Sequence, residues 1–120
     1  MSIKDNQKDK TTCPVETTLS LIGGKYKALI LWHLSGKTLR FGQLHKLIPN
    51  ATPKMLTQQL RELEVAALLN RQVYPVVPPK VEYSLTQTGE SMKPILNAIF
   101  DWGHAFLKQK GIEPSCFMCE

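Results

Sequence analysis

Apolar residues recur every three or four positions along most of the chain, and this spacing predicts several short helices. The helices predicted before residue 66 are one through Val15, Leu19 and Ile22, one from Lys25 to Ser35-Gly36, one through Leu44, Leu47 and Ile48, and one from Ala51 to Glu64. Gly23-Gly24 ends the first helix and Pro49 ends the third, because proline cannot continue a helix. A short extended link over 38–41 separates the second helix from the third.

The helix from Ala51 to Glu64 has two sides of different character. Thr52 can cap its N-terminus, and Pro53 can be its first residue, where a missing N–H costs nothing. The apolar side consists of Leu56, Leu60 and Leu63, and the polar side of Lys54, Thr57, Gln58 and Arg61. Long, donor-rich side chains reach base edges and phosphates when a helix lies in a DNA major groove. Ordinary surface helices are also polar on one side, so the neighbouring elements decide between the two hypotheses.

Two segments of alternating character follow this helix, and alternation is typical of strands. They are Arg71–Tyr74 and Val81–Leu85, joined by the proline-rich link PVVPPK, which predicts a stiff exposed loop. A short helix, a turn, a polar-faced helix and a hairpin occur in that order. The sequence therefore predicts an α+β fold, mainly α, of the winged helix-turn-helix type with a two-stranded wing and flanking dimerisation helices.

The C-terminal third of the chain predicts one long helix, for which Thr86 and Thr88 are alternative caps. Its apolar positions are Met92, Ile95, Leu96, Ile99, Phe100, Trp102, Phe106 and Leu107. These positions cover more than one face, and a second apolar face favours packing against another subunit. The alternative is that all of them pack within one protomer.

Length and charge change the picture in one respect. With 120 residues, the chain is expected to form one domain over 13–110, with an N-terminal arm at 1–12 and a loose tail at 111–120. The net charge is +5, but the segment from Lys25 to Lys80 has nine basic residues against two acidic ones. This local charge of +7 surrounds the polar helix and favours a polyanionic partner such as double-stranded DNA. A basic surface that serves only solubility is the alternative.

Several function classes have little support in the sequence. It contains no nucleophile with a neighbouring base, phosphate loop or useful pair of carboxylates, so neither an enzyme nor a cofactor is expected. No apolar run approaches the roughly 18 residues of a membrane-spanning helix. The N-terminal segment lacks the apolar core of a secretory signal, and the expected location is the cytoplasm.

Three cysteines are too few and too scattered for a disulfide scaffold, and they are expected to be thiols. Cys13 precedes Pro14 at the start of the first helix, where the helix dipole can stabilise a thiolate. Cys116 and Cys119 form a C-x-x-C without a second pair of ligands nearby, so no metal site is expected. Zinc binding shared across a dimer is the alternative for that pair.

Five linked segments resemble the HxlR-type regulators, winged-helix bacterial transcription regulators related to the MarR group. They are CPVETTLSLIGGKYKALILWHL, LRFGQLHKLIP, KMLTQQLRELE, PPKVEYSLTQTG and IFDWG, and the resemblance runs from Cys13 to about Lys110. It implies a homodimer, paired through its N-terminal and C-terminal helices, that binds operator DNA. Two departures stand out: Ala67-Leu68 replaces a common glycine before the wing, and Pro53 replaces a more polar residue.

The resemblance also bears on what the protein senses. Several family members use a cysteine at the place of Cys13 to sense quinones, aldehydes or oxidants, whereas an ordinary thiol is the alternative here. A second possibility is a small apolar ligand or electrophile inducer, with Trp32, Phe100 and Trp102 lining its pocket or simply forming core. A winged-helix module that binds only other proteins is the remaining alternative.

Roles in DNA binding follow from the predicted helix-turn-helix. Gln58 is the leading candidate for a base contact, because its amide can pair with adenine, and Arg61 can pair with guanine or a phosphate. Lys54 and Thr57 suit either role. The expected backbone contacts come from Arg71 and Lys80 on the wing, Arg40 and Lys46 beside the third helix, and Lys25 and Lys27 on the second.

Overall fold

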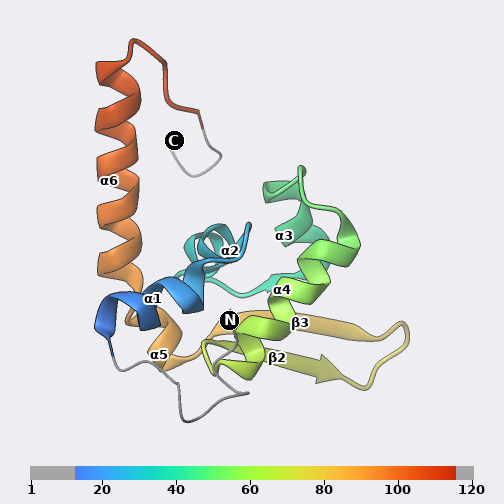
Figure 1. The fold of residues 1–120 in the computed structure, drawn as a ribbon. Coiled ribbons are helices and arrows are strands. Elements are labelled where there is room, and N and C mark those ends of the chain that lie inside the picture. The colour runs from blue at the N-terminus through green and yellow to red at the C-terminus, as the bar shows by residue number, and fades with distance from the viewer. Residues whose placement is uncertain (1–12, 116–120) are drawn as a thin grey trace.

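The computed structural model describes residues 13–115, so the predicted arm at 1–12 and the Cys116/Cys119 pair lie outside the described residues. The described elements are α1 (Pro14–Ile22), α2 (Lys27–Leu34), β1 (Leu39–Arg40), α3 (Phe41–Leu47), α4 (Pro53–Val65), β2 (Leu69–Tyr74), β3 (Lys80–Leu85), α5 (Gln87–Glu90) and α6 (Lys93–Gln109). Helices dominate, and one small antiparallel sheet completes the fold (Figure 1). The α+β, mainly α prediction is confirmed. No helix in the described part is long and apolar enough to span a membrane.

Helix α2 begins at Lys27, two residues later than Lys25, the predicted start. Tyr26 is the N-cap residue, and its backbone N–H donates to Gln59 Oε1 at 2.7 Å. The side chain of Gln59 therefore satisfies a backbone donor at the start of α2 that has no partner within the helix. The same bond ties the start of α2 to α4.

Helix α4 matches its prediction closely. Thr52 is the N-cap, with Oγ1 accepting from the backbone N–H of Met55 at 3.1 Å, and Pro53 is the first residue. Leu56, Leu60 and Leu63 are buried, as their spacing predicts. They join Ile30, Leu31, Leu34, Leu44 and Leu68 as the largest fully buried side chains.

The C-terminus of α4 is closed by two backbone hydrogen bonds of the Schellman type. The N–H of Leu68 donates to Leu63 O and the N–H of Ala67 donates to Glu64 O, both at 3.0 Å. Ala67 adopts a φ of +65°, the left-handed conformation that favours glycine.

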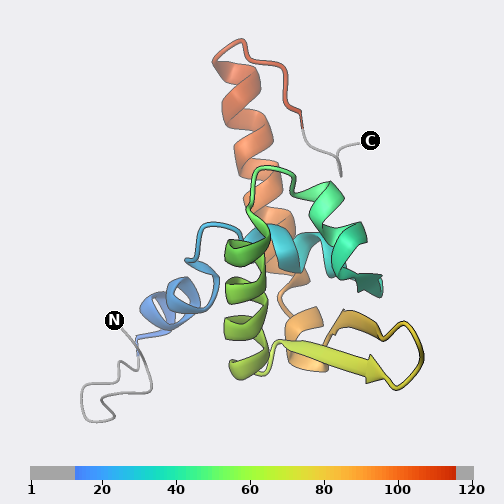
Figure 2. The same cartoon turned by 90° about the vertical axis from the view of Figure 1, so that its right-hand side faces the viewer.

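The sheet has three strands in the order β1-β3-β2, all antiparallel. The wing itself is β2, β3 and the loop 75–79 between them, and its two strands were predicted. The third strand, β1, was expected only as an extended link; it pairs Leu39 with Tyr83 and Arg40 with Glu82. In Figure 2 the wing projects from the foot of α4.

The prediction of a single long final helix is wrong, because the segment forms two helices. Thr86 Oγ1 caps the short α5 by accepting from Gly89 N at 3.0 Å, and α6 starts only at Lys93. A continuous helix would need an N–H at position 94 that donates to residue 90, and Pro94 has none. Gly89 of α5 lies so close to the backbone of Leu68 that a side chain at this position would clash with it.

Helix α6 stands along the side of the molecule away from the wing (Figure 1). One of its faces packs inward: Leu96 is buried, and Phe100 stacks on Trp32 with 5.2 Å between ring centroids. A neighbouring face remains exposed at Ile95, Ile99, Trp102 and Phe106. The expected second apolar face of the final helix is therefore present.

Candidate nucleic-acid interface

The polar side of α4 points away from the core, as its sequence pattern predicts. Lys54, Gln58 and Arg61 are exposed, and Thr57 is half-buried on the side toward the wing. Leucines hold the helix from beneath, while the bond between Gln59 and the N–H of Tyr26 fixes it from the side of α2. The orientation of this polar surface is therefore set by the core and not by the polar residues themselves.

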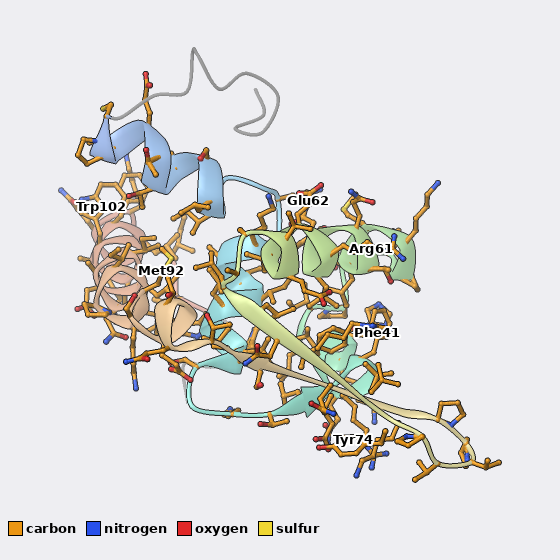
Figure 3. The ribbon with its side chains drawn as sticks, turned by 90° about the horizontal axis from the view of Figure 1, so that it is seen from below. Phe41, Arg61, Glu62, Tyr74, Met92 and Trp102 are labelled. Carbon is orange, nitrogen blue, oxygen red and sulfur yellow. The ribbon has the colours of Figure 1, made fainter. Side chains whose placement is uncertain are left out.

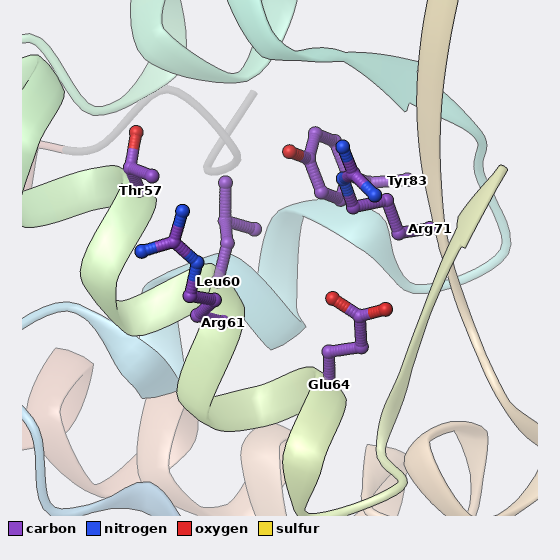
Figure 4. Close-up of a pocket in the computed structure, with 6 residues that line it drawn as sticks. All are labelled: Thr57, Leu60, Arg61, Glu64, Arg71 and Tyr83. Atoms are coloured by element: carbon purple, nitrogen blue, oxygen red, sulfur yellow. The ribbon is translucent and has the colours of Figure 1, made fainter. Parts of the chain in front are cut away.

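A hollow of about 240 Å³ separates α4 from the wing. It is lined by Thr57, Leu60, Arg61, Glu64, Arg71 and Tyr83 (Figure 4). Arg61 comes from the helix and Arg71 from β2, so each of the two elements contributes an arginine to the lining of the same space. Arginine pairs well with phosphate oxygens and with guanine.

Two residues of this hollow were not singled out from the sequence. Tyr83 faces it because it pairs across the strands with Arg71, a register that depends on how β2 and β3 align. Glu64 could have been found from the sequence, since it lies one helical turn from Leu60 on the side of Thr57. Its carboxylate reduces the local positive charge between the two arginines.

Lys80 lies at the start of β3, where the wing loop ends, opposite Tyr74. Its Nζ is 3.7 Å from Glu82 Oε2 and 4.6 Å from the centre of the Tyr74 ring. The Tyr74 hydroxyl donates to Glu82 Oε1 at 3.1 Å, and this bond, with the charge of Glu82, raises the pKa of Tyr74. The cluster orders the outer half of the wing.

Lys27 has a partner within the protein. Its Nζ lies 2.8 Å from Glu62 Oε1, and its side chain is only 14% exposed. The sequence predicts a contact of Lys27 with the DNA backbone, whereas the structure directs its side chain toward α4. Glu62 also accepts from Gln58 Nε2 at 2.9 Å. The bonds from Gln58 and then Lys27 lower the pKa of Glu62.

The other expected backbone contacts lie on three separate elements. Lys25 is exposed before α2, with Nζ 5.4 Å from the centre of the Tyr26 ring. Arg40 and Lys46, at the two ends of α3, are also exposed. The turn from α3 to α4 is braced by a 2.9 Å hydrogen bond between the His45 ring and Ala51 O. These three cations are not gathered into one cluster with the hollow.

Cys13 is exposed at the N-cap of α1, as expected, and its carbonyl accepts from Thr17 N at 2.9 Å. The three aromatic residues considered for an apolar pocket are divided by the structure. Trp32 and Phe100 stack on each other, whereas Trp102 is 67% exposed and stacks on Phe106. The first pair belongs to the packing of α2 against α6.

Comparison with known proteins agrees with this geometry. A model described as HxlR-like helix-turn-helix matches residues 21–111. The chain is 47% identical over 106 residues to YdeP of Bacillus subtilis (strain 168), an uncharacterized HTH-type transcriptional regulator; the match covers 88% of this chain and 83% of YdeP.

Two solved structures are also similar. The redox regulator HypR in its oxidized form is 46% identical, with a TM-score of 0.74, and the match covers 78% of this chain and 96% of that chain. The reduced form of the transcriptional regulator YodB from B. subtilis is 34% identical, with a TM-score of 0.69, covering 80% and 95% of the two chains. The family model covers most of the sequence, including both helices of the helix-turn-helix and the wing. The chain therefore belongs to the HxlR-like helix-turn-helix family of transcriptional regulators.

Proposed function

We propose that the protein binds operator DNA as a homodimer in the cytoplasm, with α4 in the major groove and the wing on the flanking backbone. The observation that carries this proposal is the shared hollow, where Arg61 of the helix and Arg71 of the wing face the same space. The exposed polar side of α4 continues this surface. Membership of a regulator family supports the same function.

Within this proposal, Gln58 contacts a base and Arg61 contacts a guanine or a phosphate. Lys54 and Thr57 take either role at the start of the helix. Arg71, Lys80, Arg40, Lys46 and Lys25 contact the backbone, which supplies affinity without sequence information.

The exposed apolar stripe on α6 supports pairing of two protomers. Ile95, Ile99, Trp102 and Phe106 are each at least 40% exposed, and they recur at helical spacing. Val15 and Leu19 add exposed apolar groups on α1. Apolar surface of this extent marks an interaction site, and a second copy supplies the same stripe.

Selection of duplexes from a random pool tests the proposal. The wild-type protein should enrich a sequence with two related half-sites, as expected for a symmetric dimer. Gln58→Ala should then lose discrimination at one base pair in each half-site by about 1 to 3 kcal/mol, at fixed salt. Enrichment of no sequence would reject operator binding, and unchanged preferences in the variant would reject this orientation of α4.

We further propose that Cys13 responds to oxidants or electrophiles. Support comes from its exposure at the start of α1 and from the description of HypR as a redox regulator. Diamide should release the protein from its operator and change its migration on a non-reducing gel, and Cys13→Ser should abolish both effects. A double Cys116→Ser, Cys119→Ser variant should keep them. Release of the Cys13→Ser variant by diamide would reject the proposal.

A further inference from the structure

The side chain of Gln58 is held by a chain of charged groups that begins on α2. Lys27 Nζ bonds Glu62 Oε1 at 2.8 Å, and Glu62 Oε2 accepts from Gln58 Nε2 at 2.9 Å. Figure 3 shows Glu62 on the side of α4 that faces the link between α1 and α2. Each carboxylate oxygen therefore has a different partner, one from within α4 and one from another helix.

The Lys27–Glu62 pair fixes which way the Gln58 amide is turned. An ionised carboxylate only accepts hydrogen bonds, so the amide nitrogen, and not the oxygen, must face Glu62. The bonds to Glu62 lower its pKa and keep it ionised. One N–H of Gln58 is thereby used, while the oxygen and the other N–H are available to a base.

Lys27 makes this arrangement compatible with DNA. A carboxylate on a groove-facing helix repels phosphates unless a cation compensates its charge. Lys27 supplies that cation from a nearly buried position, with a side chain 14% exposed. Its side chain reaches Glu62 across Gly24, where an added Cβ would lie 2.9 Å from Lys27 Cδ and Cε and 3.0 Å from Gln59 Oε1.

We propose that Glu62 and Lys27 are positioning residues that orient Gln58 to recognise adenine in preference to guanine. This inference rests on the proposed function of α4 as the helix that contacts bases. The amide oxygen of Gln58 accepts from adenine N6, and its second N–H donates to adenine N7. Guanine presents two acceptors there, which the fixed amide oxygen opposes. Without Glu62 the amide can turn and donate to guanine instead.

The test compares variants on the duplex that the wild-type protein selects. Gln58→Ala first identifies the base pair that Gln58 recognises. At that pair Glu62→Ala should lose about 5- to 150-fold of the preference for adenine over guanine, the range of a bidentate contact. It should bind unrelated DNA at least as tightly as wild type, because a negative charge is removed. Glu62→Gln, which keeps an acceptor, should lose less of the preference.

Asp101→Ala is the charge control, because it removes an exposed carboxylate on α6, outside both α4 and the hollow. It should also bind unrelated DNA at least as tightly, but it should keep the adenine preference. Glu62→Ala combined with Gln58→Ala should discriminate no worse than Gln58→Ala alone. Lys27→Met should lower the preference in the wild-type background and leave it unchanged in the Glu62→Ala background.

Four outcomes would overturn this inference, and one of them would also overturn the proposed function. Full adenine preference in Glu62→Ala would overturn the positioning role, and so would equal weakening on selected and unrelated DNA, which indicates damage to α4. A Gln58→Ala variant with unaltered preferences would overturn the inference by leaving Glu62 no base contact to orient. Failure of the wild-type protein to select any duplex would overturn the proposed function, and this inference with it.

Discussion

Ala67 closes α4 in a conformation that costs an L-residue free energy. Its φ is +65°, and it occupies the position after the helix cap in the two-bond closure with Leu63 and Glu64. A left-handed conformation costs a residue with a Cβ about 1–2 kcal/mol, of which glycine would recover part, since glycine loses more entropy on folding. The side chain is exposed, so no packing depends on it.

Ala67→Gly should therefore raise the free energy of unfolding by about 0.5–1 kcal/mol. Urea denaturation followed by circular dichroism measures this change. Ala66→Gly is the control, because Ala66 has an ordinary φ of −77° and the same substitution there should lower stability. A stability for Ala67→Gly equal to or below that of wild type would contradict the assigned strain.

At the scale of elements, hydrophobic periodicity predicted the helices and strands whose apolar pattern repeats along the chain. It missed the features that depend on a single residue or a single pairing. The spacing of Leu56, Leu60 and Leu63 was sufficient for α4, because three buried leucines on one stripe leave one orientation. Strand β1 has only two residues and is defined by its pairing with β3, so no local sequence pattern could predict it. The break between α5 and α6 had a visible signal in Pro94, which the strong apolar pattern outweighed.

The exposed face of α6 carries a prediction about association. Trp102 is 67% exposed and stacks on Phe106, so it can serve as an aromatic anchor for a second protomer without being needed inside the first. Trp102→Asp should raise the dissociation constant of the dimer about 30-fold, as loss of about 2 kcal/mol at an anchor implies. Analytical ultracentrifugation over a concentration series measures it.

Val77→Asp is a suitable control for that substitution, because Val77 is 98% exposed in the loop of the wing. It introduces the same charge at an apolar position and should leave association unchanged. Circular dichroism should show both variants folded. A Trp102→Asp protein that associates like wild type would place the dimer interface elsewhere.

Across the whole molecule, the excess of positive charge was visible in the sequence, but the contacts that each basic residue makes were not. In the sequence, Lys27 and Lys80 carry the same charge as Arg61 and Arg71 and cannot be told apart from them by charge alone. The fold gives Lys27 a carboxylate partner on α4, from a residue far away in the sequence. By contrast, the Gln58–Glu62 bond joins residues four positions apart on one helix and was accessible to sequence reasoning. Net charge thus predicted a polyanionic partner more readily than individual contacts.

Lys80 tests how the charge of the wing contributes to binding. Its ammonium group has Glu82 and Tyr74 as partners but remains partly exposed, with 35% of the side chain accessible. As a phosphate contact, it should release about one counterion, so Lys80→Met should weaken binding to selected and unrelated duplexes alike. The slope of log K against log salt should fall by about 1. Lys108→Met, in the last turn of α6, should leave the slope unchanged. A Lys80→Met variant that altered base preference but not the salt slope would show that the wing contacts bases and not the backbone.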